Sequence, residues 1–137
     1  MMGLDFTQIK DFASFKAKYS HRLFIHSDLD AKTQCRQWAM SVRGGYGQMR
    51  IEYETKSGLK VHKSTSPHQL AYMFAHDNLQ LDPGLEISHL CANKLCLAEG
   101  HLWAESHQAN LSRVKCHSKR VCRDLDGNPH DPPCIFM

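Results

Sequence analysis

The sequence predicts a small α+β domain, and three observations lead to this prediction. Apolar side chains recur every three or four residues over residues 4–19, which is the period of an amphipathic helix. Apolar and polar side chains alternate over residues 36–63, which is the period of β-strands. Five of the six cysteines lie within residues 91–134 and are interleaved with histidines, as is typical of zinc ligands. At 137 residues we expect a single domain that spans residues 1–137.

The bulk properties argue against a membrane protein and favour a reducing compartment. No apolar run is long enough to cross a bilayer, and the first five residues lack the basic and apolar regions of a signal peptide. We therefore expect no membrane partner and an intracellular protein, nuclear in a eukaryotic cell, whose cysteines bind metal. The alternative is a secreted domain with three disulfides. The net charge of +3 weakly favours a polyanionic partner.

Residues 1–34 form the first predicted unit, an N-terminal helical segment. The apolar stripe of its helix, over residues 4–19, is expected in the core and consists of Phe6, Ile9, Phe12, Phe15 and Tyr19. Residues 35–65 follow as a predicted antiparallel β-meander of about three strands. Its turns are expected at residues 44–45 and 56–58, where glycine allows tight chain reversal.

A helix, two short strands and a second helix are predicted next. Pro67 suits the first turn of a helix that continues to about His76, before turn residues at 82–84. Residues 85–114 then predict two strands and a helix that Ser106 can cap, over residues 85–90, 102–104 and 107–114. The chain therefore places a strand–loop–strand–helix unit after the meander.

A closely spaced ligand set lies between these two strands. Cys91, Cys96 and His101 can surround one zinc ion, which leaves one position of a closed tetrahedron empty. Cys35 is the one cysteine left over after the C-terminal ligands are assigned, so we predict that it closes this site. Zinc would then tie the meander to the loop. Because a closed zinc site has no open position, the chemistry would need a different metal.

Residues 115–137 are expected to form a second zinc site, a C-terminal zinc knuckle. The segment is polar and rich in proline and glycine, so we expect disorder unless a metal ion orders it. Four ligands with suitable spacing are available: Cys116, Cys122, His130 and Cys134. His117 is an alternative to His130, but a histidine adjacent to Cys116 reaches the same ion poorly. We therefore predict two structural zinc ions.

Two further polar residues are candidates for catalysis. His89 precedes Cys91 by two residues, so on a strand both side chains leave the same face. Asn110 lies on the helix that follows the second strand. A histidine outside the ligand set and an asparagine held against a zinc-tied loop favour a metal-dependent nuclease over a plain zinc module.

The segment SHLCANKLCLAEGHLWAESHQAN, which ends at Asn110, resembles the His-Cys box homing endonucleases, a branch of the ββα-metal or His-Me finger nucleases. The resemblance is strong from about Glu86 to Cys134, is weaker over residues 35–80, and does not cover the first thirty residues. It implies that residues 85–114 are the ββα-metal motif. It also implies that the two Cys₃His sets are the two zinc sites of the family.

The resemblance implies a Mg²⁺-dependent endonuclease that hydrolyses phosphodiester bonds in double-stranded DNA. His89 would be the general base, a role that suits a neutral imidazole with a pKa near ~6.5. Asn110 would bind one Mg²⁺ through its amide oxygen, and this ion would act as a Lewis acid at the scissile phosphate. A homodimer is an assembly that the resemblance allows.

Residues 35–65 are expected to be the DNA-binding sheet, because an antiparallel ribbon fits the major groove. The resemblance implies an arginine on this sheet that contacts the scissile phosphate. We align Lys60 with it, with Arg50 as a rival, and lysine lacks the bidentate fork of arginine. The predicted DNA contacts are Arg50, Lys60, Lys63 and Arg113.

Two other functions compete with the enzyme. One is a non-catalytic, zinc-stabilised DNA-binding module derived from such a nuclease, and the other is a structural zinc adaptor for protein partners. A binding module needs neither His89 nor Asn110. The presence of both therefore favours the endonuclease.

Overall fold

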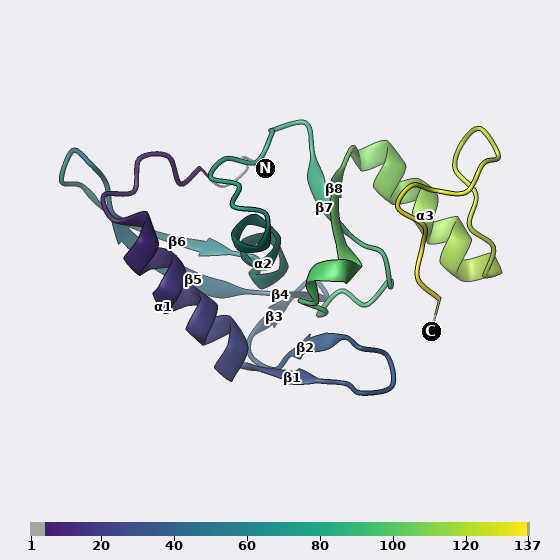
Figure 1. The fold of residues 1–137 in the computed structure, drawn as a ribbon, viewed down its shortest axis with the longest axis horizontal. Helices are drawn as coiled ribbons and strands as arrows, with labels where there is room; N and C mark the ends of the chain where they lie inside the picture. Colours follow the sequence, from purple (N-terminus) through teal and green to yellow (C-terminus); the bar gives the residue numbers. More distant parts are fainter. Residues whose placement is uncertain (1–4, 137) are drawn as a thin grey trace.

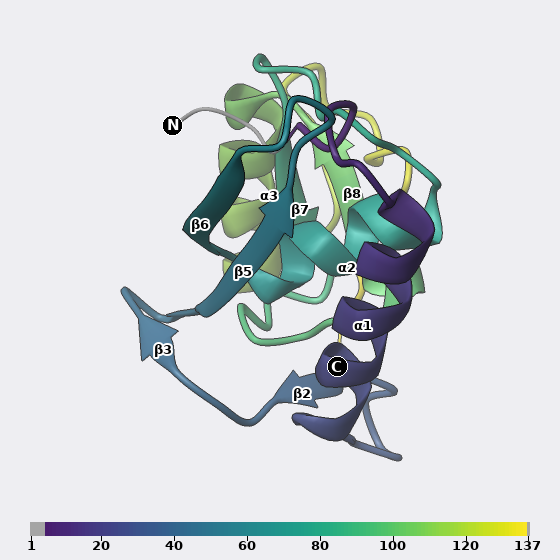
Figure 2. The same ribbon diagram turned by 90° about the vertical axis from the view of Figure 1, so that its left-hand side faces the viewer.

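The computed structural model describes residues 5–136, which form a mixed α+β fold of antiparallel strand pairs and three α-helices. This confirms the predicted fold class. Helices α1 (Phe12–Ile25) and α2 (Pro67–Ala75) lie on the same side of a long hairpin made of β5 (Met49–Glu54) and β6 (Lys60–Thr65), as Figures 1 and 2 show. Among these residues, no helix combines the length and the apolar character that a bilayer span requires.

The strands of residues 35–65, which were expected as one meander, are divided among three successive hairpins, and the two strands that were predicted after them form a fourth. Besides β5 and β6, the pairs are β1 with β2, β3 with β4, and β7 with β8. Their bounds are β1 (Ser27–Leu29), β2 (Arg36–Trp38), β3 (Val42–Arg43), β4 (Tyr46–Gly47), β7 (Glu86–His89) and β8 (Leu102–Glu105). The turns fall where predicted, with positive φ angles at Gly44 (63°), Gly45 (84°) and Gly58 (89°).

Strand β2 does not pair with β5 because its second edge is already occupied. The backbone N–H of Trp38 donates to the carbonyl of Leu95 at 2.9 Å, and the N–H of Leu97 donates to the carbonyl of Arg36 at 2.8 Å. Leu95 and Leu97 belong to the loop that carries ligands of the first predicted zinc site. Backbone groups paired to this loop are not available to another strand, so the sheet is interrupted here.

Helix α1 begins later than predicted. Residue 4, the first of the predicted helix at 4–19, lies outside the described residues, and the helix starts at Phe12. Asp11 caps it by accepting a backbone hydrogen bond at 3.1 Å. Phe6 and Ile9 are nevertheless buried, because the segment before the helix forms β-bridges with neighbouring segments. Their spacing therefore reflects burial of a segment of turns, in which the N–H of Ile9 donates to the carbonyl of Phe6 at 3.2 Å, and not the α-helix that was predicted.

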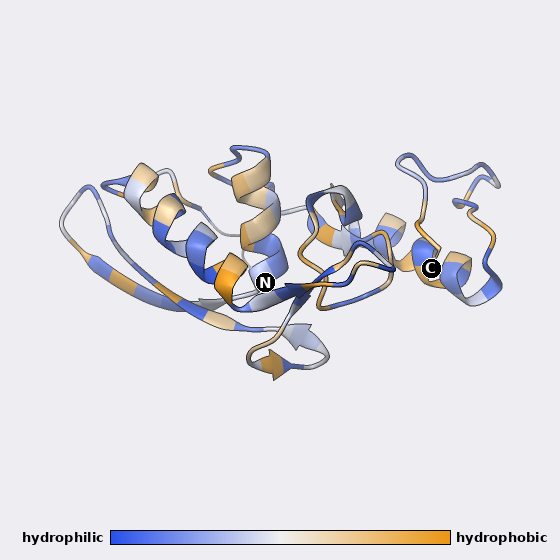
Figure 3. Ribbon diagram, turned by 60° about the horizontal axis from the view of Figure 1, so that its bottom comes forward, coloured by the Kyte–Doolittle hydropathy of each residue, from blue (hydrophilic) through white to orange (hydrophobic). Residues whose placement is uncertain are grey.

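The hydrophobic core lies between α1, α2 and the inner face of the β5–β6 hairpin. Figure 3 shows both helices over one face of this hairpin. Fully buried side chains come from all of these elements and from the N-terminal segment: Phe6, Tyr19, Ile51, Leu70 and Met73. The Tyr19 hydroxyl accepts a hydrogen bond from the backbone N–H of Glu52 at 2.8 Å, which fastens α1 to β5.

The β7–β8 hairpin and helix α3 (His107–Lys119) form the second half of the molecule. Ser106 caps α3 as predicted, because its Oγ accepts a hydrogen bond from the N–H of Ala109 at 3.1 Å. The helix continues past Val114, its predicted last residue, and is followed by Arg120 in a left-handed conformation with φ of 57°. Residues 121–136 contain neither helix nor strand.

A buried ion pair joins α3 to β8. The Arg113 guanidinium contacts both carboxylate oxygens of Glu105, at 2.7 and 2.9 Å, and donates to the carbonyl of Pro132 at 2.9 Å. Arg113 is 2% exposed. The structure therefore corrects the prediction that Arg113 contacts DNA. A charge this deep in the interior must be paired, and here the partners are a carboxylate and the C-terminal segment.

Replacement of Arg113 by methionine should strongly destabilise the protein, because it leaves the Glu105 carboxylate buried without its partner. We expect a loss of about 3–5 kcal/mol in the free energy of unfolding, measured by urea titration of the zinc-loaded protein. Lys119→Met is the matched control, since Lys119 is exposed on the same helix. Equal stability of the two variants would show that the ion pair is unimportant.

Candidate functional site

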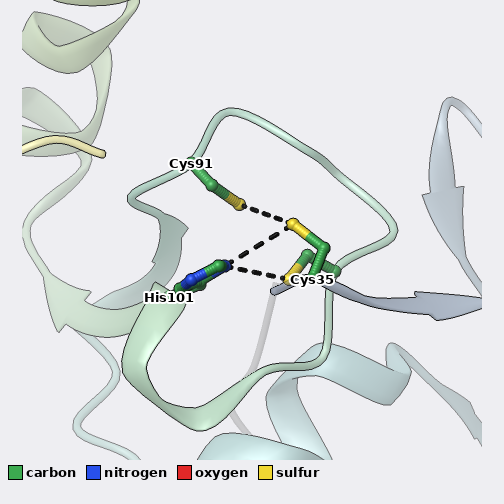
Figure 4. Close-up of side chains that lie close together, drawn as sticks. Cys35, Cys91 and His101 are labelled. Carbon is green, nitrogen blue, oxygen red and sulfur yellow. Dashed lines mark hydrogen bonds between the residues drawn. The ribbon is translucent and has the colours of Figure 1, made fainter. Parts of the chain in front are cut away.

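Four side chains form the first cluster, at the end of β7 (Figure 4). The Sγ atom of Cys35 lies 3.7 Å from that of Cys91 and 3.5 Å from Nδ1 of His101. The Sγ atom of Cys96 lies 3.4 Å from the same Nδ1. Around a tetrahedral zinc ion with Zn–S bonds of about 2.3 Å, ligand atoms are about 3.7 Å apart. The cluster therefore fits one structural zinc ion, with Cys35 as the closing ligand.

The second cluster fastens the C-terminal segment to α3. The Nδ1 atom of His130 lies 3.5, 3.3 and 3.7 Å from the Sγ atoms of Cys116, Cys122 and Cys134, respectively. Its Nε2 lies 2.7 Å from the Ser112 hydroxyl, which orients the ring. His117 packs instead against Phe136, with ring centroids 5.3 Å apart. The four predicted ligands therefore meet, and His117 is not among them.

Crowding of buried thiols explains why the first cluster favours a bound cation. Burial raises the pKa of Cys35, and hydrogen bonding to Cys96 together with burial raises that of Cys91. A hydrogen bond from the Cys91 thiol lowers the pKa of Cys96 to about 5. The proton that Cys91 keeps therefore stabilises the thiolate of Cys96. Zn²⁺ would allow all three to ionise together. All six cysteines lie within the described residues and none forms a disulfide, so the structure does not have the three disulfides of the alternative interpretation.

His89 ends strand β7 and is held by the first zinc loop. Its ring hydrogen-bonds with the backbone of Cys96, whereas its Nε2 atom is buried without a partner. In a neutral imidazole, the nitrogen that donates carries the proton and the other carries a lone pair. Because Nε2 has no partner, a proton on Nδ1 would face the Cys96 backbone and would leave the lone pair on Nε2. This is the arrangement that a general base requires.

Two aromatic rings cover His89. The His68 ring centroid lies 4.5 Å from that of His89, and Tyr46 lies 5.8 Å from His68 and 6.1 Å from His89. Burial lowers the pKa of His89 to about 4 and that of His68 to about 3, so both imidazoles are neutral at pH 7. Sequence analysis did not identify His68, because it lies in the first turn of α2 far from any ligand motif.

A pocket of about 610 Å³ opens beside these rings. It lies between the β3–β4 hairpin, the start of α2, β7 and α3, and its polar lining includes Arg43, His68, Glu86 and Asn110. His89 does not line the pocket itself, but contacts the lining rings of His68 and Tyr46. The structure therefore brings Asn110 to the pocket directly, and His89 through its neighbours.

Glu86 fixes the side-chain amide of Asn110. The Nδ2 atom of Asn110 donates to Oε1 of Glu86 at 2.6 Å, and Nδ1 of His107 lies 3.1 Å from both carboxylate oxygens. A carboxylate only accepts hydrogen bonds, so the NH₂ group must face Glu86 and the oxygen Oδ1 is left for a ligand. The sequence motif predicts Asn110 as a site residue but neither Glu86 nor His107. The Glu86 side chain meets those of Asn110 and His107 only because α3 packs against β7.

The predicted DNA-contacting cations of the β5–β6 hairpin are divided between its faces. Arg50 pairs with Ser64, a residue that lines the pocket. Lys63 is the cross-strand partner of the buried Ile51, so its side chain lies on the core face of the hairpin. There its charge acts on the carboxylate of Asp5. Lys60 lies four residues before Ser64, about 13 Å along the strand at 3.3 Å per residue. Proximity to the pocket therefore favours Arg50 and the pocket-lining Arg43 over Lys60.

Zinc analysis of the purified protein should give about two ions per chain, because two complete Cys₃His sets are present. Cys35→Ser and Cys134→Ser should each remove one ion. Cys35→Ser should also abolish amide protection in β2 and in the loop, whereas Cys134→Ser should expose mainly residues 121–136. Hydrogen exchange followed by mass spectrometry measures both effects. Parent-like zinc content in either variant would show that its cysteine is not a ligand.

Comparison with known proteins bears on these features. Searches of the curated proteins and of the solved structures found no match. The family model for the zinc-binding loop region of homing endonucleases matches residues 31–137, which includes all eight cluster ligands and both candidate catalytic residues. Since the match covers more than half of the chain, the protein belongs to this family of homing-endonuclease zinc-binding proteins.

Proposed function

We propose that this protein is a divalent-metal-dependent DNA endonuclease with His89 as the general base. The observation that carries the proposal is the orientation of His89: a neutral ring held by Cys96, with the lone pair of Nε2 unpartnered. Membership of the homing-endonuclease family supports a nuclease origin and DNA as the substrate. In this role Nε2 accepts a proton from the attacking water, and the hydrogen bond through Nδ1 stabilises the resulting imidazolium.

The pocket provides groups that fit a magnesium ion. Mg²⁺ prefers oxygen ligands and retains several waters, and the Asn110 Oδ1 atom is an oxygen donor that Glu86 leaves free. Asn110 would hold the ion, which when bound supplies Lewis-acid stabilisation of the phosphate and of the leaving oxygen. Arg43 at the pocket and Arg50 beside it would bind backbone phosphates, a role that suits the planar guanidinium.

His89→Ala should preserve folding, zinc content and DNA binding, because His89 is not a zinc ligand. Plasmid nicking should fall about 10²–10⁴-fold, the usual contribution of a general base. Asn110→Ala should also slow nicking, but part of its activity should return at high Mg²⁺ concentration, whereas that of His89→Ala should not. A magnesium titration of nicking rates distinguishes the two variants.

His68→Ala is the matched control, since His68 is a second buried, neutral imidazole 4.5 Å from His89. It should retain more activity than His89→Ala, because the backbone hydrogen bond to the zinc loop belongs to His89. Unchanged nicking by His89→Ala, together with loss in His68→Ala, would transfer the role of base to His68.

The pH dependence of cleavage provides an independent check. A base whose pKa is lowered to about 4 is unprotonated across the neutral range and loses activity only as pH falls toward that value. The nicking rate at saturating Mg²⁺ should therefore change less than about 1.5-fold between pH 6.0 and 7.5. A base with the ordinary pKa of about 6.5 would give a rise of about fourfold. Zinc content measured at pH 6.0 controls for ligand protonation.

One observation favours the second candidate, a non-catalytic DNA-binding module. His89 is only 9% exposed beneath His68 and Tyr46, so its lone pair is covered in the unbound protein. Such a module would bind double-stranded DNA with an affinity that falls steeply as salt rises, yet cleave no substrate at any Mg²⁺ concentration. DNA binding by a parent protein without nicking activity would establish this function in place of the enzyme.

A further inference from the structure

Glu86 lines the pocket and accepts a hydrogen bond from the side-chain amide of Asn110. We propose that Glu86 is a positioning residue for a divalent cation site. Its carboxylate holds the Asn110 amide with Oδ1 available to the cation and adds negative charge next to it. This inference rests on the proposed role of Asn110 as the metal-binding residue.

The geometry derives from two elements. Glu86 is the first residue of β7, and Asn110 and His107 lie three residues apart on α3, so that both side chains project from the same face of the helix. Both contact the same carboxylate: Nδ2 of Asn110 at 2.6 Å and Nδ1 of His107 at 3.1 Å. The His107 contact involves both carboxylate oxygens, so two side chains of α3 hold the Glu86 carboxylate in place.

Hydrogen-bond chemistry makes Glu86 a selector of amide orientation. The side-chain amide of asparagine ends in two groups of similar shape: an NH₂ group, which donates two hydrogen bonds, and an oxygen, which accepts them. Without a neighbour that distinguishes them, the amide can present NH₂ to the pocket and repel a cation. A carboxylate rejects the opposite orientation, because it would place Oδ1 against an anionic oxygen. Glu86 therefore selects the orientation in which the oxygen can bind a metal.

Glu105 shows that this use of a carboxylate is specific to Glu86. The two glutamates are cross-strand partners in the β7–β8 hairpin. Glu105 is buried against Arg113, whereas the Glu86 side chain is 40% exposed and borders the pocket. Among residues 5–136, the ion-pair partner of Glu86 is His107. Glu86 thus places a carboxylate at the pocket that contacts His107 and the Asn110 amide and is not paired with a buried arginine.

The first test measures metal binding without DNA. Mn²⁺ is added to zinc-loaded protein, and the free ion is followed by electron paramagnetic resonance. Glu86→Ala should weaken Mn²⁺ binding about 10–100-fold, the usual effect of losing a group that orients a metal ligand. Glu86→Gln should weaken it less, because its amide oxygen still accepts from Asn110. Glu99→Gln, which removes an exposed carboxylate of η1 (Glu99–His101), should bind as the parent does.

The second test follows the amide itself. The protein is labelled with ¹⁵N and studied by NMR with its zinc ions bound and no Mn²⁺ added. The side-chain NH₂ signals of Asn110 are identified as those that are missing from the spectrum of Asn110→Ala. They should move toward the position of a solvated amide in Glu86→Ala and remain in place in Glu99→Gln. Unchanged signals in Glu86→Ala would overturn the inference, and so would parent-like Mn²⁺ affinity.

Asn110→Ala separates failure of this inference from failure of the proposed function. If Asn110→Ala loses Mn²⁺ binding while Glu86→Ala retains it, Asn110 holds the metal without help from Glu86, and this inference alone is wrong. If Asn110→Ala binds Mn²⁺ as tightly as the parent, the metal-binding role of Asn110 is wrong, and the proposed mechanism fails with it. Zinc content and unfolding curves of each variant confirm that the fold is retained.

Discussion

The first Cys₃His cluster is the constraint on which the position of the candidate base depends. Cys35 lies just before β2, Cys91 and Cys96 lie in the loop after β7, and His101 lies in the 3₁₀ turn before β8. Closing the chain between Cys35 and Cys91 costs configurational entropy, and a structural zinc ion can offset it with folding free energy on the order of 10 kcal/mol. Cys96 has two functions in this arrangement. Its thiol belongs to the cluster, and its backbone orients His89.

A second set of interactions holds helix α3 against β7 and β8. The Arg113–Glu105 pair is buried at the helix–strand junction, and the Arg113 guanidinium also lies 3.4 Å from Sγ of Cys134 in the second cluster. The C-terminal segment, the helix and the hairpin are therefore coupled through one charged side chain. This coupling fixes the rotation of α3 and hence the placement of Asn110 next to Glu86. A helix with few buried residues of its own depends on such anchors.

The pocket forms where these two anchored units meet the β3–β4 hairpin and α2. Its lining combines the neutral imidazole of His68, which contacts the ring of His89, with the amide of Asn110, the carboxylate of Glu86 and the guanidinium of Arg43. Burial keeps His68 and His89 uncharged, so they would not repel the cation that we propose at Asn110. In the proposed mechanism the proton acceptor, the metal ligand and the phosphate-binding charge are separate groups, each with one role in metal-assisted hydrolysis.

The sequence alone determined the local features of this protein. Cysteine and histidine spacing identified eight ligands, including Cys35 by elimination, and capping and turn residues located α2, α3 and the glycine turns. These features depend on neighbours within a few residues, so local patterns are sufficient. The apolar periodicity did not predict the late start of α1, which Asp11 fixes as the N-cap. It did not predict the division of the meander into hairpins either, because β2 pairs with the zinc loop.

Only the tertiary structure decided which charges are buried and which polar side chains meet. Arg113 and Lys115 are indistinguishable as helix cations in the sequence, yet Arg113 lies against Glu105 and Lys115 is exposed. His68 and Glu86 became part of the site through the packing of α2 and α3, at sequence separations of 21 and 24 residues from His89 and Asn110, respectively. Such contacts depend on how whole elements pack, and the burial that sets the pKa of His89 arises only when that packing excludes water.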